Sequence, residues 1–235
     1  MNITYRPSET RGPTRLDWLD SRHTFSFGHY YDPRHMGFGP LRVINEDIVA
    51  AGGGFAPHSH ANMEIISIVL NGTLAHRDSL GTVQTLVPGE VQRMSAGSGI
   101  QHSEFNGAKD KPVHFLQIWI LPDRENTAPG YAQKTFPLAD RHGRWLPLVN
   151  PDGSDGALSI RQDARLFVTR LGAGQALDYA AAAGRKLWLQ VASGSVIVGE
   201  QVLNVGDGAA IVGESTIHVA STAGDTELYL FDLAP

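Results

Sequence analysis

Two stretches decide the fold: PHSHANMEIISIVLNG (residues 57–72) and PGEVQRMSAGSGIQHSEFN (residues 88–106). Each sets a pair of polar side chains, two positions apart, into a run of apolar and β-branched residues. Successive side chains of a β-strand point to opposite faces, so the members of such a pair share one face. The pairs are His58 with His60 and His102 with Glu104. Three imidazoles and one carboxylate could therefore meet at a single metal ion.

The chemistry of these side chains narrows the choice of ion. Neutral imidazole nitrogens and a carboxylate oxygen suit iron, manganese, nickel, copper or zinc. The chain contains no cysteine, which removes thiolate sites and disulfides. Four protein ligands on an ion that prefers six leave two neighbouring positions for water, dioxygen or substrate. Such a site is suited to catalysis rather than to holding a fold together.

The spacing of these residues resembles the two sequence motifs of the cupin superfamily. The first motif, G-x5-H-x-H-x3,4-E-x6-G, is matched by Gly52, His58, His60 and Glu64, with Gly72 one residue late. The second motif, G-x5-P-x-G-x2-H-x3-N, is matched by Gly89, Gly97, His102 and Asn106. Ser95 replaces its proline, and four residues instead of two precede the histidine. The late Gly72 and the two extra residues before His102 lengthen turns. Neither changes which face of its strand a ligand occupies.

Residues 19–81, which begin LDSRHTFSFGHYYDPRH, resemble the pirin family, in particular its bacterial quercetin 2,3-dioxygenase-like members. The resemblance is close over residues 17 to about 136 and loose over the remainder. It implies that Glu104 is the fourth metal ligand, beside His102, and that Glu64 does not bind the ion. Glu64 lies an even number of residues from His58 and His60, so on a continuous strand it would face the same side. It therefore remains an alternative for the fourth ligand.

The rest of the chain predicts an all-β fold. Its apolar stretches are short, β-branched and separated by Gly, Pro, Asn and Asp, and helical periodicity is scarce. Residues 67–104 are echoed by residues 189–221, which pairs Gly72 with Gly194, Gly89 with Gly206 and His102 with His218. We therefore expect a bicupin, with two double-stranded β-helix (jelly-roll) barrels.

The two expected domains differ in their ligands. Residues 1–136 form the predicted N-terminal metal-binding cupin domain, and residues 137–235 form a C-terminal degenerate cupin domain without metal. In the second copy, the positions that correspond to His58 and His60 fall within residues 179–183, a tyrosine and four alanines. Ala220 corresponds to Glu104, and His218 is left as a lone histidine.

Composition excludes several classes of function. Charged residues make up 18% of the chain, the net charge is -5 and the pI is about 6.0, so no general basic surface is available for nucleic acid. The first residues, MNITYRPSETRGPTRLDW, lack the apolar core of a signal peptide, and no stretch approaches the ~20 apolar residues of a membrane span. We expect a cytoplasmic protein without a membrane partner.

The resemblance implies a metal-dependent dioxygenase that opens the central ring of a flavonol with O2 and releases carbon monoxide. Its partners would be O2 and a small aromatic, flavonol-like substrate. Fe(II) is the expected ion, while nickel, copper, manganese or zinc could also bind. The ion would coordinate the deprotonated hydroxyl of the substrate, and Glu104 would take the proton.

Two alternatives stay open. The first is an iron-binding, redox-sensing regulatory protein that acts through a protein partner, and a substrate-sized cavity opening onto the metal would argue against it. The second is a cupin isomerase for a sugar phosphate. It would need Lys and Arg side chains around the phosphate, and only Arg77 and Arg93 are near in sequence.

Other candidate residues stay outside the predicted site. The aromatic run at residues 23–35 either covers a pocket or packs as an N-terminal arm. His76 and His114 are not included in the predicted site.

Overall fold

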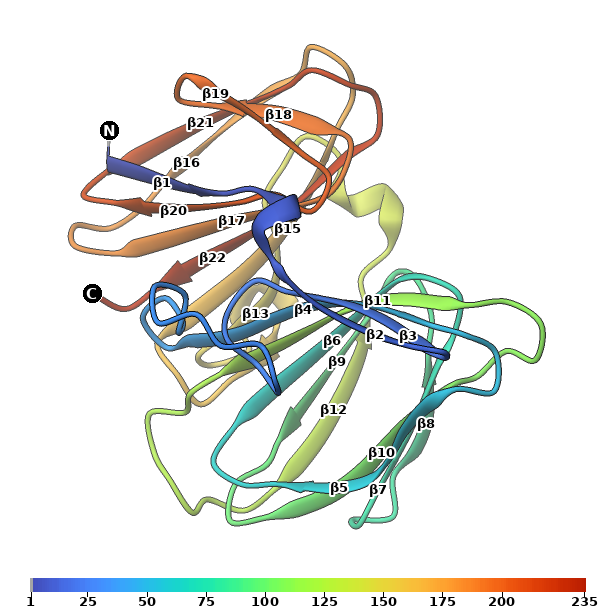
Figure 1. Cartoon of the computed structure of the whole chain (residues 1–235). Helices are drawn as coiled ribbons and strands as arrows, with labels where there is room; N and C mark the ends of the chain where they lie inside the picture. Colours follow the sequence, from blue (N-terminus) through green and yellow to red (C-terminus); the bar gives the residue numbers. More distant parts are fainter. Residues whose placement is uncertain (1) are drawn as a thin grey trace. The chain divides into compact units, whose positions relative to one another are not determined.

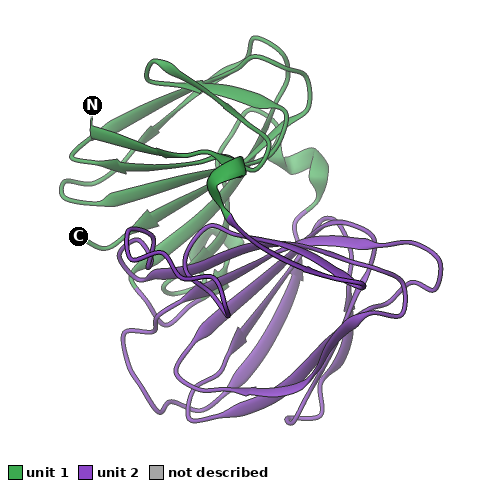
Figure 2. Cartoon of the chain, viewed as in Figure 1, with its two compact units in different colours: residues 1–11, 137–159, 163–235 green, residues 12–136, 160–162 purple. Residues whose placement is uncertain are grey.

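The structure is a computed structural model that describes residues 2–235, and nearly all of its regular structure is β-strand. Contacts between residues divide the chain into two compact units, coloured separately in Figure 2. Unit 1 comprises residues 1–11, 137–159 and 163–235, and unit 2 comprises residues 12–136 and 160–162. Helical structure within the described residues is limited to short 3-10 segments: η1 (Ser8–Thr10), η2 (Leu138–Arg141) and η3 (Ser154–Gly156).

Unit 2 contains two antiparallel sheets, labelled in Figure 1. The larger has the order β12 (Gly130–Thr135), β9 (Glu90–Ser95), β6 (Glu64–Asn71), β11 (Val113–Ile120), β4 (Leu41–Val49), β3 (Leu19–His23) and β2 (Gly12–Leu16). The smaller has the order β5 (Gly54–His60), β10 (Ile100–Asn106), β7 (Leu74–Asp78) and β8 (Val83–Leu86). Both predicted ligand pairs lie in the smaller sheet, on the adjacent strands β5 and β10.

Unit 1 repeats this arrangement. Its larger sheet has the order β1 (Asn2–Arg6), β20 (Gly208–Val212), β17 (Lys186–Ser193), β22 (Thr226–Leu233), β15 (Ala164–Leu171), β13 (Leu146–Asn150) and β14 (Leu158–Ser159). The smaller has the order β16 (Ala176–Ala180), β21 (Thr216–Ser221), β18 (Ser195–Val198) and β19 (Gln201–Asn204). Strand pairing is antiparallel except between β13 and β14.

Each unit buries its core between its own two sheets. In unit 2, one apolar cluster joins Val69 and Phe115 of the larger sheet to Leu74 and Leu86 of the smaller one. In unit 1, a larger cluster joins residues of β17, β20 and β22 to residues of β18, β19 and β21. The alternation of buried and exposed residues along β10 and β18 follows from this packing. The predicted all-β class is confirmed.

The internal repeat is also visible in the backbone. Gly72 and Gly194 both adopt positive φ, at 86° and 71°, in the turn between the first strands of the repeat. A Cβ on Gly72 would lie 2.7 Å from the carbonyl oxygen of Pro112, and one on Gly194 would lie 2.7 Å from Cα of Thr226. Each turn therefore needs glycine, both for its left-handed backbone and for its close approach to a neighbouring strand. The matching glycines predicted from the sequence occupy equivalent turns.

The first residues of the chain lie in unit 1, whereas the sequence-based division into domains 1–136 and 137–235 placed them in the N-terminal domain. β1 pairs with β20 along its whole length, from Asn2 opposite Val212 to Arg6 opposite Gly208. Residues 2–6 therefore form the edge strand of a sheet in unit 1, because strand pairing between distant segments, and not local sequence, decides which sheet a strand joins.

None of the helical segments in residues 2–235 has the length and apolar character needed to span a lipid bilayer.

Candidate metal centre

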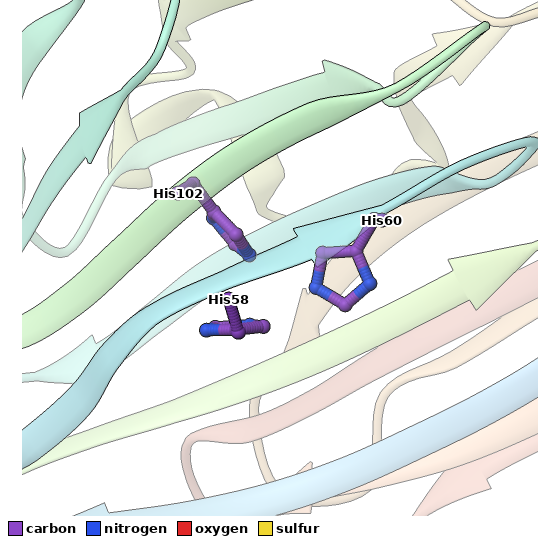
Figure 3. Close-up of side chains that lie close together, drawn as sticks. All are labelled: His58, His60 and His102. Carbon is purple, nitrogen blue, oxygen red and sulfur yellow. The ribbon is translucent and has the colours of Figure 1, made fainter.

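Three histidine side chains gather on one side of strands β5 and β10 (Figure 3). His58 lies directly opposite His102 in the antiparallel pairing, and His60 lies opposite Ile100. The ring centroids are 4.5 Å apart for His58 and His102, 4.7 Å for His58 and His60, and 4.9 Å for His60 and His102. One ring nitrogen from each lies within 4.8 Å of the others. We call these residues the three-histidine cluster.

A β-bulge orients His58. His102 pairs with His58 while Glu104 pairs with Phe55, so β5 holds one extra residue in the segment Ala56–Pro57. Pro57 suits this position because it has no N–H to leave unpaired in the ladder. The Nδ1–H of His58 donates to the carbonyl oxygen of Ala56 at 2.8 Å, and a carbonyl can only accept. The tautomer is thereby fixed, and the Nε2 lone pair of His58 is left for a ligand.

The other two histidines carry buried nitrogens that suit a metal ion. Nε2 of His60 and both ring nitrogens of His102 are buried without a hydrogen-bond partner among the described residues. The pKa of His60 is lowered to about 4 and that of His102 to about 3, chiefly by burial and in addition by the charges of neighbouring histidines. These rings are therefore neutral at pH 7, the form that coordinates metals. The donor set fits a transition-metal ion of the kind predicted from the sequence.

Glu104 lies two residues beyond His102 on β10 and is held in a buried polar layer. Ser67 donates its hydroxyl to Oε1 of Glu104 at 3.2 Å, and Gln117 donates its amide to Oε2 at 2.5 Å. Gln92 donates in turn to the Ser67 hydroxyl at 3.3 Å. All four side chains are buried, and we call them the polar layer.

Burial raises the pKa of Glu104 to about 7. Burial is the largest cause, and the charge of Asp47 acts in the same direction. Hydrogen bonds from Ser67 and Gln117 lower the pKa because they stabilise the carboxylate, and the value of about 7 is the net result. A carboxyl group near this value can exchange a proton at neutral pH. The site thus combines neutral imidazole nitrogens with a titratable carboxyl group.

Glu64, the sequence-based alternative, lies in a different environment. It is buried and accepts a hydrogen bond of 2.7 Å from the Ser95 hydroxyl. Burial raises its pKa, while that hydrogen bond and the charges of Arg93 and Arg161 lower it. Among the described residues, the groups of close metal-ligand atoms contain Glu104 together with His102 and His76, and they do not contain Glu64.

A cavity of about 190 Å³ opens onto the histidines. Aromatic rings of Phe27, Phe55 and Trp119 line it. Trp119 packs edge-on against His60 at 4.8 Å and against Phe27 at 5.2 Å. The aromatic run at residues 23–35 therefore contributes to the cavity wall, together with polar side chains from β2, β3, β4 and β11: Thr14, Ser21, His23, Asn45, Asp47 and Gln117.

Comparison with known proteins agrees with this geometry. Residues 5–120 match the family model described as pirin, and residues 147–233 match the quercetinase C-terminal cupin domain. A quercetin 2,3-dioxygenase of Escherichia coli strain K12 is 42% identical over 233 residues, which is 99% of each chain. The chain belongs to the pirin family. The resemblance noted from the sequence and the bicupin fold are both confirmed.

Two further pirin relatives extend the comparison over the full chain. A pirin-like protein of Caulobacter vibrioides is 42% identical and covers 99% of this chain and 100% of its own. The crystal structure of the bacterial pirin YhhW from Escherichia coli in complex with nickel(II) is 41% identical, has a TM-score of 0.95 and covers 100% of both chains. A relative of the same fold and length thus binds a transition metal.

The second cupin unit of this pirin has one tyrosine and otherwise apolar residues where unit 2 has the three-histidine cluster and the polar layer. When the paired strands of the two units are matched through Gly72 and Gly194, Tyr179, Ala181, Ile217 and Val219 take the places of His58, His60, His102 and Glu104. The polar layer is replaced in the same way by Leu189, Ala209 and Leu230, all within the apolar core. These four positions in unit 1 hold no histidine and no carboxylate, and a C-terminal domain without metal stays a prediction.

One detail of the predicted repeat was wrong. His218 occupies the position of Ser103, not that of His102, and its exposed ring hydrogen-bonds to Asp178 at 2.6 Å. A shift of one residue along a strand turns every side chain to the other face, so Val219 rather than Ala220 corresponds to Glu104.

Sequence reasoning also missed residues that surround the ligands. His76 was left outside the predicted site, yet it is buried with its ring centroid 5.4 Å from that of His102. Ser67, Gln92 and Gln117 were not singled out, although Ser67 and Gln117 each interrupt a mainly apolar strand with a polar side chain. That interruption is the signal that could have found them, because a buried carboxylate needs donors nearby.

Proposed function

We propose that this protein is a metal-dependent dioxygenase that opens the central ring of a flavonol with O2. This is the activity in the name of its quercetin 2,3-dioxygenase relatives. The observation that carries the proposal is the three-histidine cluster in the wall of a cavity that aromatic side chains also line. Full-length similarity to those relatives supports the same activity.

We assign four ligands to one divalent transition metal ion: His58, His60, His102 and Glu104. We expect Fe(II) in the cell, with nickel, copper, manganese or zinc able to bind the same nitrogen and oxygen donors. The ion supplies Lewis acidity toward the hydroxyl of the substrate and a redox-active centre for O2. The carbonyl oxygen of Ala56 keeps Nε2 of His58 available by holding the proton on Nδ1.

Glu104 is the proposed catalytic base. A carboxylate oxygen of Glu104 accepts the proton of the flavonol hydroxyl, and its pKa of about 7 makes this transfer favourable near neutral pH. Ser67 and Gln117 hold the carboxylate in place and stabilise its charged form before the substrate arrives. An amide at position 104 could not accept the proton in this way.

The cavity favours a flat, partly apolar substrate. Its volume of about 190 Å³ is below the ~300 Å³ that commonly encloses a drug-sized ligand. We therefore infer that the reacting ring lies against Phe27, Phe55 and Trp119, and that the rest of the flavonol extends past exposed Gly28 and His29. None of the described lining residues is Lys or Arg, which argues against a sugar phosphate substrate.

An oxygen-uptake assay tests the proposal. Metal-loaded protein is mixed with quercetin, and both oxygen consumption and carbon monoxide release are followed. We expect activity that disappears on chelation and returns when Fe(II) or another divalent transition metal is restored. If fully metallated protein consumes no oxygen with any flavonol, yet captures a specific partner in only one iron oxidation state, the regulatory alternative should replace the enzymatic one.

A further inference from the structure

His76 is a buried histidine that the proposed chemistry does not use. It lies on β7, the strand beside β10, where it pairs with Glu104. Its side chain is 1% exposed, and its ring centroid is 5.4 Å from that of His102. His76 does not line the cavity that opens onto the three-histidine cluster. It therefore stands beside a metal ligand without facing the substrate.

Asp78 fixes the tautomer of His76. Nε2 of His76 lies 3.0 Å from Oδ2 of Asp78, and an ionised carboxylate can only accept, so Nε2 carries the proton. Asp78 is itself held, because its Oδ1 accepts the backbone N–H groups of Leu80 at 2.9 Å and Thr82 at 3.1 Å. Nδ1 of His76 is consequently a lone pair, buried without a hydrogen-bond partner among the described side chains and backbone.

The ring of His76 is also held by packing. Tyr131 lies against it with ring centroids 4.9 Å apart and planes inclined by 31°. The Tyr131 hydroxyl donates into the polar layer, at 3.1 Å from Oε1 of Gln92. His76 thus has both its orientation and its proton position determined by neighbours outside the metal ligands.

His102 needs the acceptor that His76 offers. A histidine that binds a metal through one ring nitrogen carries a proton on the other, and metal-binding histidines almost always donate that N–H to a second group. Ring nitrogens of His102 and His76 and a carboxylate oxygen of Glu104 lie within 4.8 Å of one another. No direct hydrogen bond joins the two rings, because Nδ1 of His76 and both ring nitrogens of His102 have no hydrogen-bond partner among the described residues. A gap of up to 4.8 Å accommodates two hydrogen bonds of about 2.8 Å through one water.

We propose that His76 is a positioning residue for the metal ligand His102: its Nδ1 accepts the N–H of His102 through one bridging water, and Asp78 holds His76 in the required tautomer. The inference rests on the proposed metal site and deepens it. The metal would thereby be linked through His102, water and His76 to a buried carboxylate.

Metal affinity and coordination spectra test this role without relying on turnover. We expect His76→Phe, which keeps an aromatic ring at this position but has no Nδ1, to weaken Ni(II) binding by roughly 10- to 100-fold. The same change should shift the visible absorption bands of the Co(II)-loaded protein. Asp78→Asn should have a similar effect, because an amide that donates to Nε2 forces the other tautomer. His76→Gln, whose amide oxygen can still accept, should retain most of the wild-type affinity.

His114→Phe is the matched control. His114 also pairs with a carboxylate, that of Glu46 at 2.9 Å, but it lies outside the groups of close ligand atoms. This variant should leave the affinity and the spectrum unchanged. Circular dichroism confirms that each variant is folded before its affinity is compared.

The outcomes separate the two proposals. Wild-type affinity and an unchanged Co(II) spectrum in both folded His76 variants would overturn the positioning role. Binding of two metal equivalents by the wild type and one by His76→Phe would also overturn it, since His76 would then be a ligand of a second ion. A wild-type protein that binds one metal but consumes no oxygen would refute the dioxygenase proposal alone.

Discussion

Gln117 donates a hydrogen bond of 2.5 Å from its side-chain amide to Oε2 of Glu104. The bond joins β11 of the larger sheet to β10 of the smaller one across the interior of unit 2. An N–H donor stabilises the ionised carboxylate, so Gln117 opposes the burial that raises the pKa of Glu104 to about 7. The charge state of the proposed fourth ligand therefore depends on a residue outside the proposed ligand set.

Proton release on metal binding should depend on pH through Glu104. Below its pKa of about 7, the metal-free protein holds a proton on this carboxyl, which must leave before an oxygen can bind the ion. We expect Ni(II) binding to release roughly one more proton at about pH 6 than at about pH 8. His60 and His102 add nothing to the difference, because their pKa values of about 4 and about 3 keep both rings neutral throughout. Calorimetry in buffers of different ionisation enthalpy measures the release.

Two variants control that measurement. Glu104→Gln should show a smaller difference in proton release between the two pH values than the wild type, since its amide does not titrate. Gln117→Leu removes a donor to the carboxylate, so the pKa should rise and the extra release should persist to higher pH. An identical pH dependence in wild type and Glu104→Gln would assign the proton to another group.

The two buried glutamates should differ in their effect on turnover. Glu104→Gln should lose oxygenase activity far more than it loses metal, because three histidines still hold the ion but an amide cannot accept the proton of the substrate. Glu64→Gln should change both little, since Glu64 bonds to Ser95 in a separate cluster. Steady-state oxygen uptake and elemental analysis compare the variants. The opposite ranking would move the role to Glu64.

Metal stoichiometry should be one ion per chain. Single changes His58→Ala and His102→Ala should abolish tight binding, because each removes a member of the three-histidine cluster. His218→Ala should keep one equivalent, as this exposed residue bonds to Asp178 in unit 1. Elemental analysis after extensive dialysis gives the counts. Two tightly bound ions in the wild type would show that the proposed site is incomplete.

The aromatic wall of the cavity should affect substrate affinity more than metal binding. Phe27 packs edge-on against Trp119 and lines the cavity. Phe27→Ala should raise KM for quercetin by roughly 10-fold or more, the factor expected from losing one buried aromatic contact. Tyr31→Ala, in the same segment but 72% exposed, is the matched control and should leave KM unchanged. A normal KM in Phe27→Ala would place the substrate elsewhere.

Local sequence patterns predicted the ligand strands because the period of a strand is fixed. His58 with His60, and His102 with Glu104, share a face wherever their strands lie. The turn glycines Gly72 and Gly194 were equally readable, since each ends an apolar run. These patterns determine local geometry, namely the face on which a side chain lies and the residue that a turn needs. The structure agrees with the sequence on both.

Register and long-range pairing could not be predicted in the same way. The placement of His218 depended on an alignment, and an error of one residue reversed its facing. His76 became important only because β7 pairs with β10 and sets it beside Glu104. The membership of β1 in unit 1 likewise rests on pairing with β20, about two hundred residues away. No local feature of the sequence carries that information.

The apolar replacements in unit 1 bear on attempts to engineer a second catalytic centre into this scaffold. Introducing ligands at Tyr179, Ala181, Ile217 and Val219 would copy the coordinating side chains alone. The new glutamate at position 219 would then lie among Leu189, Ala209 and Leu230, with no donor for its charge. A carboxyl group in such surroundings would remain protonated and leave the ion short of one ligand. A transplant would have to carry Ser67, Gln92 and Gln117 as well as the four ligands, so the module to be transferred has seven residues rather than four.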